Sequence, residues 1–462
     1  MPATVASLKG DLNISFNEVP NVLDVTVPRE EESIVREVVL NNETVSVIEF
    51  NGLSGIGKTV LLHRIADTHF NWDPTLESAT KPTLTTLVDL QSYSQGNVEV
   101  RMRVIAAEVI RQLNLQLTEE QQLDPDTFLS SSNLIALLNQ YVPIFIFDNS
   151  NFANDSLELE LQRWINQQIK LVGKAKKSVF VFAGVAPIKW ESFALRRHLL
   201  QIEMLPFSEM QVGEQLVKEF GDVTEEEIQL VAYYGAGLPG ISAKILTILR
   251  KAGGTNQEFA ERFHNELILP MFKEVPENIK EKVFQIAALR KFTLFEIARI
   301  YKSLGVNTAG IGKILVSTGY VRYSLLLHAY VMDPTVRRMV NRNQRLRDPE
   351  EFSVAHLAMT DLHRESIVST MSSTYITEAI YHSIQASRVL EHPQDELRNQ
   401  VNSIVQIVKK GLHKNYSLEG VVEYYLRQTL DIVRTQVLAD SEVLELLGPE
   451  ELNLLLEALK IE

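Results

Sequence analysis

The residues with the most specific chemistry lie in one short segment, Gly52 to Thr59, which reads GLSGIGKT. It fits the pattern G-x-x-x-x-G-K-[ST], in which glycines let successive backbone N–H groups turn toward a phosphate. Lys58 can place its charge on the β- and γ-phosphates, and the Thr59 hydroxyl can ligate Mg²⁺. The residues predicted to contact a nucleotide here are Gly52, Gly55, Ile56, Gly57, Lys58, Thr59 and Val60.

The hydrophobic run Pro143–Asp148, with the sequence PIFIFD, ends in an acid of the kind that holds Mg²⁺ beside such a loop. Asp148 is therefore predicted to share the metal ion with Thr59. The next residue is Asn149, which can orient a water molecule by hydrogen bonding but cannot accept its proton. Lys58, Asp148 and Asn149 are the predicted catalytic residues, and hydrolysis at this site should be slow.

The base of the nucleotide is inferred by elimination. The Asn-Lys-x-Asp pattern that selects guanine in GTPases does not occur in the sequence. We therefore expect an adenine nucleotide, ATP or ADP, bound together with Mg²⁺.

The elements that must position this loop alternate between short apolar runs and longer periodic segments, from Val45 to about Leu205. Apolar runs that nearly lack polar alternation, separated by helices, are typical of a parallel sheet covered on both faces. The sequence therefore predicts a three-layer α/β domain, with the loop between its first strand and first helix. The predicted strands are Val45–Phe50, Leu84–Leu90, Pro143–Asp148, Ser178–Ala183 and Leu199–Leu205, and the predicted helices are Thr59–Phe70, Val98–Leu113, Asn133–Tyr141 and Ser156–Val172.

Beyond Pro206 the strand signal disappears, apart from a weak hairpin-like run at Gly319–Val331. The remainder is predicted to be mostly helical, with glycines and prolines dividing it into modules. A lead-in segment precedes the sheet and is expected to contain a helix that begins near Pro28. The predicted domains are 1–44, 45–205, 206–268, 271–347 and 350–462.

Composition narrows the class of protein. The chain has 462 residues, a net charge of −14 and no cysteine, which excludes disulfides, thiol catalysis and cysteine metal sites. Its longest apolar stretches are shorter than the ~18 residues that a membrane-spanning helix needs. The N-terminal residues lack the pattern of a secretory signal. We expect a cytoplasmic protein that does not enter a membrane.

The order of the motifs resembles the STAND class of signal-transducing ATPases, which includes the NB-ARC and NACHT switches, and its bacterial members in particular. VPREEE (Val27–Glu32) is similar to the entry motif of that family, and GLSGIGKT and PIFIFD are similar to its two phosphate-site motifs. The segment from Glu203 resembles the start of the helical lid, and Gly237–Gly240 (GLPG) resembles the Gly-x-Pro motif. The resemblance covers about residues 25–390.

This resemblance implies an architecture and further nucleotide contacts. The P-loop NTPase sheet would be followed by a helical lid, a winged-helix-like module and C-terminal helices. Arg29 would lie near the nucleotide, Arg196 or Arg197 would be a sensor arginine, and Pro239 would approach the adenine. The chain departs from the family at Asp333, which stands where many members have a histidine that touches ADP.

A basic segment, Ala287–Arg347, holds eleven basic residues against two acids and has a local net charge of +9. A winged helix reads DNA through its third helix, and that helix, near Asn307–Thr318, offers only Lys313 as a basic residue. Seven acids in Asp440–Glu462 offer an internal partner. We therefore expect the basic segment to act within the protein or its assembly. Structural roles are predicted for the histidines His356, His363 and His382, for which no metal-ligand spacing is evident.

The expected function is an ATP-dependent molecular switch, in which slow hydrolysis is coupled to conformational change and to self-assembly or recruitment of protein partners. The alternative is a nucleic-acid-binding ATPase or transcriptional regulator that uses the basic segment. A small-molecule kinase is disfavoured, because the region after the sheet shows no substrate-pocket signature.

Overall fold

The computed structural model describes residues 26–41, 47–70, 83–94, 96–123, 140–152, 155–172, 178–252, 255–273, 275–300, 308–325, 327–390 and 393–460. The chain forms two compact units, Met1–Lys244 and Ile245–Glu462. The expected helix Asn133–Tyr141, apart from its last two residues, and most of the lead-in segment lie outside the described residues. The division into five domains stays a prediction.

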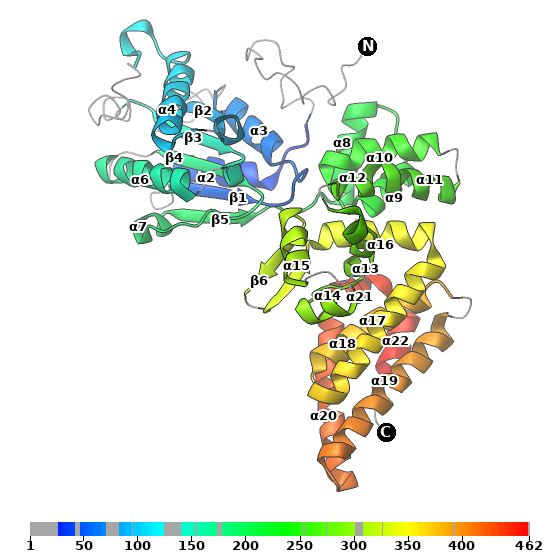
Figure 1. Ribbon diagram of the computed structural model, residues 1–462. Helices are drawn as coiled ribbons and strands as arrows, with labels where there is room; N and C mark the ends of the chain where they lie inside the picture. The colour runs from blue at the N-terminus through cyan, green and yellow to red at the C-terminus, as the bar shows by residue number, and fades with distance from the viewer. Residues whose placement is uncertain are drawn as a thin grey trace. The chain divides into compact units, whose positions relative to one another are not determined.

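The first unit is built on a five-stranded parallel sheet with the strand order β2-β3-β4-β1-β5 (Figure 1). Each predicted strand is confirmed, with ends that shift by at most two residues. The elements are α2 (Glu30–Asn41), β1 (Val47–Asn51), α3 (Lys58–Phe70), β2 (Thr83–Asp89), η3 (Leu90–Tyr93), α4 (Val98–Asn114), η4 (Glu119–Gln121), β3 (Val142–Asp148), η6 (Ser150–Phe152), α6 (Asp155–Val172), β4 (Val179–Gly184), α7 (Phe193–Arg196), β5 (Leu199–Glu203), α8 (Glu209–Phe220), α9 (Glu225–Gly235) and α10 (Pro239–Lys251), of which the first six residues belong to this unit.

Helices cover both faces of this sheet. On one face, Phe145 of β3 stacks on Phe180 of β4 with ring centroids 5.1 Å apart, and Trp164 of α6 meets both rings edge-on. Helix α4 packs on the same core. On the other face, α3 packs against the strands and α2 packs against α3. The three-layer α/β fold predicted from the sequence is confirmed.

One buried carboxylate fixes the connection between β4 and β5. Glu49 lies in the middle of β1 and is fully buried. Its side chain accepts hydrogen bonds from the Ile188 amide, from Trp190 Nε1 at 2.7 Å and from Gln201 Nε2 at 2.9 Å. Because a buried carboxylate is costly unless its oxygens are bonded, these three donors lock the loop after β4 and the edge strand β5 onto β1.

The second unit is mostly helical, as predicted. A two-stranded antiparallel hairpin interrupts the helices, and its Tyr330 also bridges Phe292, so the weak hairpin signal is confirmed. The elements are α11 (Asn256–Phe263), the π-helical turn η8 (His264–Ile268), α12 (Leu269–Met271), α13 (Glu277–Ala288), α14 (Leu294–Ile300), α15 (Thr308–Ser317), β6 (Val321–Ser324), β7 (Ala329–Met332), α16 (Pro334–Arg347), α17 (Pro349–Thr370), α18 (Ser373–Ser387), α19 (Pro393–Asn415), α20 (Glu419–Ala439), α21 (Ser441–Leu446) and α22 (Pro449–Ala458).

The C-terminal helices α17 to α22 share one apolar core, to which Ile380, Val401, Leu430 and Leu455 contribute buried side chains. Among the described residues, no helix combines the length and the apolar content that crossing a membrane requires.

Ion pairs join the basic segment to the acidic C-terminal helices within this unit. Arg290 contacts both Glu378 and Asp440, and the buried Arg337 contacts Glu442. Arg338 and Arg342 both pair with one further acid, Glu445. The internal partner that the sequence predicts for the basic segment is therefore present in the structure.

Candidate nucleotide-binding site

The loop Gly52–Gly57 connects the carboxyl end of β1 to the first residue of α3, as its motif requires. Gly55 and Gly57 have φ angles of +83° and +96°, which residues other than glycine rarely adopt. Ile56, between them, is buried and anchors the loop, whereas Val60 in the first turn of α3 is exposed. The loop therefore has the backbone that lets its N–H groups and the N-terminus of α3 face a phosphate.

Lys58 folds back over the loop. Its Nζ donates to the carbonyl oxygens of Gly52 at 2.8 Å and Leu53 at 2.7 Å. Burial lowers the pKa of Lys58 to about 8, while the nearby Asp148 carboxylate acts in the opposite direction. A β- or γ-phosphate oxygen can accept the hydrogen bonds that these two carbonyl oxygens now accept from Lys58 Nζ. The lysine is therefore already directed at the centre of the loop.

The two predicted metal residues lie in direct contact. Thr59 Oγ1, in the first turn of α3, donates to Asp148 Oδ2 at 2.6 Å. This contact forms although β4 lies between β3, which ends in Asp148, and β1, which leads into the loop before Thr59. Burial raises the pKa of Asp148, and the hydrogen bonds from Thr59 and the Asn149 amide oppose that shift. A hydroxyl and a carboxylate at this edge of the sheet are hard oxygen ligands of the type that Mg²⁺ prefers. The residues present thus fit Mg²⁺.

Asn149 is held in an unusual conformation that turns its side chain toward the neighbouring strand. Its φ angle is +54°, and its Nδ2 donates to Asp89 Oδ1 at 2.9 Å. Asp89 ends β2 directly beside Asp148 in the sheet register. Asp89 was not among the predicted site residues, because a catalytic carboxylate was expected only in the position after Asp148. The sequence signal for Asp89 is the apolar run LTTLVDL (Leu84–Leu90), in which this acid lies at the end of a predicted strand.

Arg29 lies against the phosphate loop, as the family resemblance implies. Its guanidinium donates to the carbonyl oxygens of Ile56 and, at 3.2 Å, of Leu205, and it lies over the Phe207 ring with 4.4 Å to the centroid. Burial lowers the pKa of Arg29, and the carboxylate of Glu31 counteracts this effect. A contact between Arg29 and a nucleotide stays a prediction.

The Gly-Leu-Pro-Gly turn also meets the loop directly. The amide of Gly240 donates to the Gly55 carbonyl oxygen at 2.8 Å, and a Cβ at Gly57 would lie 3.7 Å from the Pro239 ring. A side chain at Gly240 would come within 2.8 Å of that same Gly55 oxygen. The turn can therefore approach the phosphate loop this closely only because residue 240 is glycine, whereas a Cβ at Gly55 would lie 3.8 Å or more from the turn.

The structure does not bring Arg196 and Arg197 to the phosphate loop. They precede β5, whose first residue Leu199 is in register with Val47 at the start of β1. The loop follows the opposite end of β1, so the length of a five-residue strand, about 17 Å, separates the two edges. Both guanidinium groups lie over the exposed Phe193 ring instead.

Asp333, which stands in place of the family's histidine, has a structural contact in the second unit. Its Oδ1 accepts from the Thr335 amide at 2.8 Å and caps the N-terminus of α16. Burial raises the pKa of Asp333, whereas its hydrogen bonds from residues 335 and 336 lower it.

Comparisons with known proteins bear on the fold alone. No family model and no curated protein matches the chain. The Walker-type ATPase of Pyrococcus abyssi is similar to it with 15% identity and a TM-score of 0.45, covering 68% of this chain and 95% of the other. The ORC2 protein of Aeropyrum pernix in its ADP form has 12% identity and a TM-score of 0.43, with 74% and 97% covered. A STAND protein with a tetratricopeptide repeat sensor from Pyrococcus horikoshii has 14% identity and a TM-score of 0.27, with 94% and 58% covered.

Proposed function

We propose that this chain is a STAND-class switch that binds Mg²⁺–ATP at Gly52–Thr59 and hydrolyses it slowly. The observation that carries the proposal is the convergence of Arg29 and the Gly-Leu-Pro-Gly turn on the same three loop residues, Gly55 to Gly57. A phosphate-binding loop with such neighbours is mechanically linked to segments distant in the sequence, which is what a nucleotide-controlled switch needs.

Nucleotide binding would exchange contacts that the loop now makes with itself. Lys58 would move its two donors from the Gly52 and Leu53 carbonyl oxygens to phosphate oxygens, and the added negative charge would raise its pKa above about 8. Mg²⁺ would be held by Thr59 and, directly or through water, by Asp148. When bound, the ion neutralises charge on the phosphates during transfer.

Slow hydrolysis follows from the arrangement around Asn149. Its amide cannot accept a proton, and its Nδ2 is committed to Asp89. A water molecule activated here depends on the Asp89 carboxylate, which lies on a separate strand and is also bonded to the Gln91 amide. A switch tolerates this arrangement, because its signal needs a long-lived ATP state more than rapid turnover.

Calorimetric titration of the full chain with Mg²⁺–ATP and Mg²⁺–ADP tests nucleotide binding. Lys58→Ala should weaken ATP binding by roughly 100-fold or more, because it removes charge-assisted hydrogen bonds to phosphate. Lys189→Ala, on the exposed connection after β4, is the matched control and should bind like wild type. Equal affinities for the Lys58 variant and the wild type would contradict the proposal.

The switch itself is tested by limited proteolysis and by mass measurement in the two nucleotide states. A switch gives different cleavage patterns or different assembly sizes with ADP and with a non-hydrolysable ATP analogue. Identical cleavage patterns and identical masses with both nucleotides would show that the protein does not change its structure or assembly with the nucleotide. This result would contradict the switch part of the proposal.

A nucleic-acid-binding ATPase is the second candidate, and one structural neighbour, the ORC1 protein of Aeropyrum pernix, is described in complex with DNA. The ion pairs of Arg290, Arg337 and Arg342 with acids of the same unit argue against it here. A duplex-binding titration at two salt concentrations decides. Tight, steeply salt-dependent binding that is lost when the exposed Lys313 and Arg322 are changed to glutamate would favour this candidate.

A further inference from the structure

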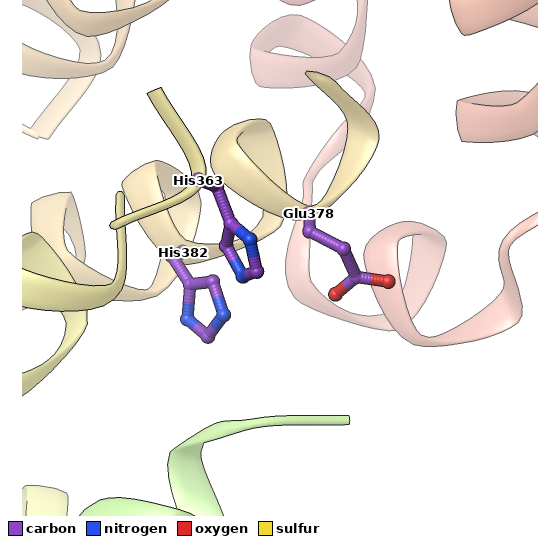
Figure 2. Close-up of side chains that lie close together, drawn as sticks. All are labelled: His363, Glu378 and His382. Carbon is purple, nitrogen blue, oxygen red and sulfur yellow. The ribbon is translucent and has the colours of Figure 1, made fainter. Parts of the chain in front are cut away.

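Three histidines and one glutamate meet inside the helical core of the second unit. His356 and His363 lie two turns apart on one face of α17, and Glu378 and His382 lie one turn apart on one face of α18. One donor atom each of His363, Glu378 and His382 lies within 4.8 Å of the other two (Figure 2). We call His363, Glu378 and His382 the histidine–glutamate cluster. Residues distant in the sequence therefore form a group that was not apparent from their spacing.

All members of this group are shielded from water. The exposed fractions are 0% for His356, 4% for His363, 7% for Glu378 and 0% for His382. The two rings of His363 and His382 are nearly parallel, at 19°, with centroids 5.3 Å apart. Polar side chains placed this deep normally have all their hydrogen-bonding atoms partnered.

Most of the ring nitrogens are not partnered. His356 Nδ1 and His382 Nδ1 bond to each other at 2.9 Å. Among the described residues, Nε2 of His356, both ring nitrogens of His363 and Nε2 of His382 have no hydrogen-bond partner. Each buried polar atom without a partner is unfavourable, and here four such atoms gather in one place. This pattern indicates a ligand that the nitrogens bind.

We propose that His363, Glu378 and His382 bind one Zn²⁺ ion, which ties α17 to α18. Two imidazoles and one carboxylate form a ligand set that Zn²⁺ accepts, with a fourth position left for water or a further side chain. Donor atoms around tetrahedral Zn²⁺ lie about 3.3 Å apart, since each bond is about 2.0–2.1 Å long. The donor atoms of the cluster lie within 4.8 Å of one another, so they have to close by at most about 1.5 Å to reach that spacing.

Neighbouring residues hold the side chains of the cluster in place. Glu378 accepts a hydrogen bond from Arg290 Nε at 3.0 Å, and Arg290 also pairs with Asp440, so the carboxylate is held in place. If His382 coordinates through Nε2, its Nδ1 carries the ring proton and donates a hydrogen bond to His356 Nδ1. His356 would thus be a positioning residue that fixes the tautomer of His382, as outer partners of zinc-bound histidines do.

The competing interpretation is a polar core of stacked neutral histidines that binds nothing. It accounts for the parallel rings of His363 and His382, but it leaves four buried nitrogens without partners, whereas a bound Zn²⁺ would partner two of them, one on His363 and Nε2 of His382. The two interpretations differ in one measurable property, the affinity of the folded chain for Zn²⁺. This inference does not depend on the proposed nucleotide site, because none of its residues belongs to that site.

The experiment uses the full chain without a polyhistidine tag, stripped with a chelator and titrated with Zn²⁺ in competition with a chromophoric chelator. The wild type should bind one Zn²⁺ per chain, and its Tm should rise by several degrees with Zn²⁺ and fall again with chelator. His363→Gln and Glu378→Gln should each weaken Zn²⁺ binding by roughly 100-fold or more. His413→Gln, an exposed histidine of α19, is the matched control and should bind like wild type.

Two further arms keep the test decisive. Asp148→Asn, which removes the predicted Mg²⁺ ligand, should retain the Zn²⁺ site, and nucleotide affinity of His363→Gln should equal that of wild type. Co²⁺ added to the stripped wild type should give the intense visible bands of a four-coordinate ion, even where a cluster variant fails to fold. Absence of Zn²⁺ binding and of these bands in the wild type, or full Zn²⁺ affinity in folded His363→Gln, would overturn the proposal.

Discussion

The phosphate loop and the histidine–glutamate cluster achieve a similar concentration of polar groups by opposite means. In the loop, Lys58 finds its partners among carbonyl oxygens five and six residues away. In the cluster, the side chains come from two helices, and several nitrogens find no partner among the described residues. A site made from local backbone keeps its shape when distant packing changes, whereas a site made between helices depends on that packing. Substitutions in each region test this difference.

The largest effect is expected at Arg337, which holds the packing around the cluster. Its guanidinium is buried, donates to Tyr381 Oη at 2.9 Å and pairs with Glu442. Arg337→Ala should lower the free energy of unfolding by about 3–5 kcal/mol, because it breaks a buried pair and leaves Tyr381 and Glu442 without this donor. Its neighbour Arg338 is partly exposed and lies 3.8 Å from Glu445, so Arg338→Ala should cost less than about 1 kcal/mol. Denaturant unfolding measures both, and equal losses would contradict the contrast.

The next largest effect is expected at Gly240, which tests whether the phosphate loop depends on its contact with a distant turn. A Cβ there would lie 2.8 Å and 2.9 Å from the backbone O and Cα of Gly55, so the turn and the phosphate loop must separate. Gly240→Ala should cost about 1–3 kcal/mol of stability and weaken ATP binding by roughly tenfold. Gly420→Ala is the control, since a Cβ at that helical position meets nothing within 4 Å. Unchanged ATP affinity in Gly240→Ala would show that the loop is independent of the turn.

A smaller effect is expected at Asp89. If its carboxylate accepts the proton of the attacking water beside Asn149, Asp89→Asn should slow ATP turnover by about tenfold or more. Nucleotide affinity should stay unchanged, because Asp89 lies on β2 and has no described contact with the phosphate loop. Single-turnover hydrolysis and calorimetry separate the two quantities. A loss of affinity with normal turnover would assign Asp89 to binding.

The smallest effect concerns His264, a buried histidine outside the cluster. Burial lowers its pKa to about 4, with the Arg347 charge acting in the same direction and a bond with Asn343 opposing it. The unfolded chain then binds a proton more readily between about pH 6.5 and 4. The stability that neutral His264 contributes is therefore complete above about pH 6.5 and is lost as the pH falls toward 4.

His264→Gln should reduce the loss of stability over that pH window by on the order of 1 kcal/mol. Zn²⁺ affinity should not change, because His264 does not belong to the cluster. Thermal unfolding at several pH values, with and without Zn²⁺, checks both statements. An unchanged pH dependence, or a loss of Zn²⁺ binding, would show that the two kinds of buried histidine are not distinct.

The sheet and the phosphate loop could be predicted because their signals are local. Apolar runs of five to seven residues fixed the strands, and a contiguous motif located Lys58 and Thr59. The prediction of Arg196 or Arg197 as a sensor arginine was based on the order of motifs along the chain. That order does not say on which edge of the sheet these residues lie. Residues just before a parallel strand lie at its amino edge, and phosphates bind at the carboxyl edge.

The histidine–glutamate cluster could not be predicted from local sequence patterns. Glu378 and His382 do have the spacing of one helical turn, but the third ligand, His363, lies on another helix. Which face of α17 meets which face of α18 is decided by the packing of the whole core, including residues such as Val401 and Leu430. Asp89 was missed for a related reason, since only the sheet register aligns it with Asp148.

The single hydrogen bond between the Gly240 amide and the Gly55 carbonyl oxygen has a thermodynamic consequence that acts in both directions. If a nucleotide favours one position of the loop, it changes the fraction of molecules in which the turn is attached. By reciprocity, any partner that pulls the turn away must change nucleotide affinity by the same factor. One neutral hydrogen bond contributes about 1 kcal/mol, so this contact alone can couple the two events by about fivefold. A protein bound near the turn could thus act as an exchange factor for the nucleotide without touching it.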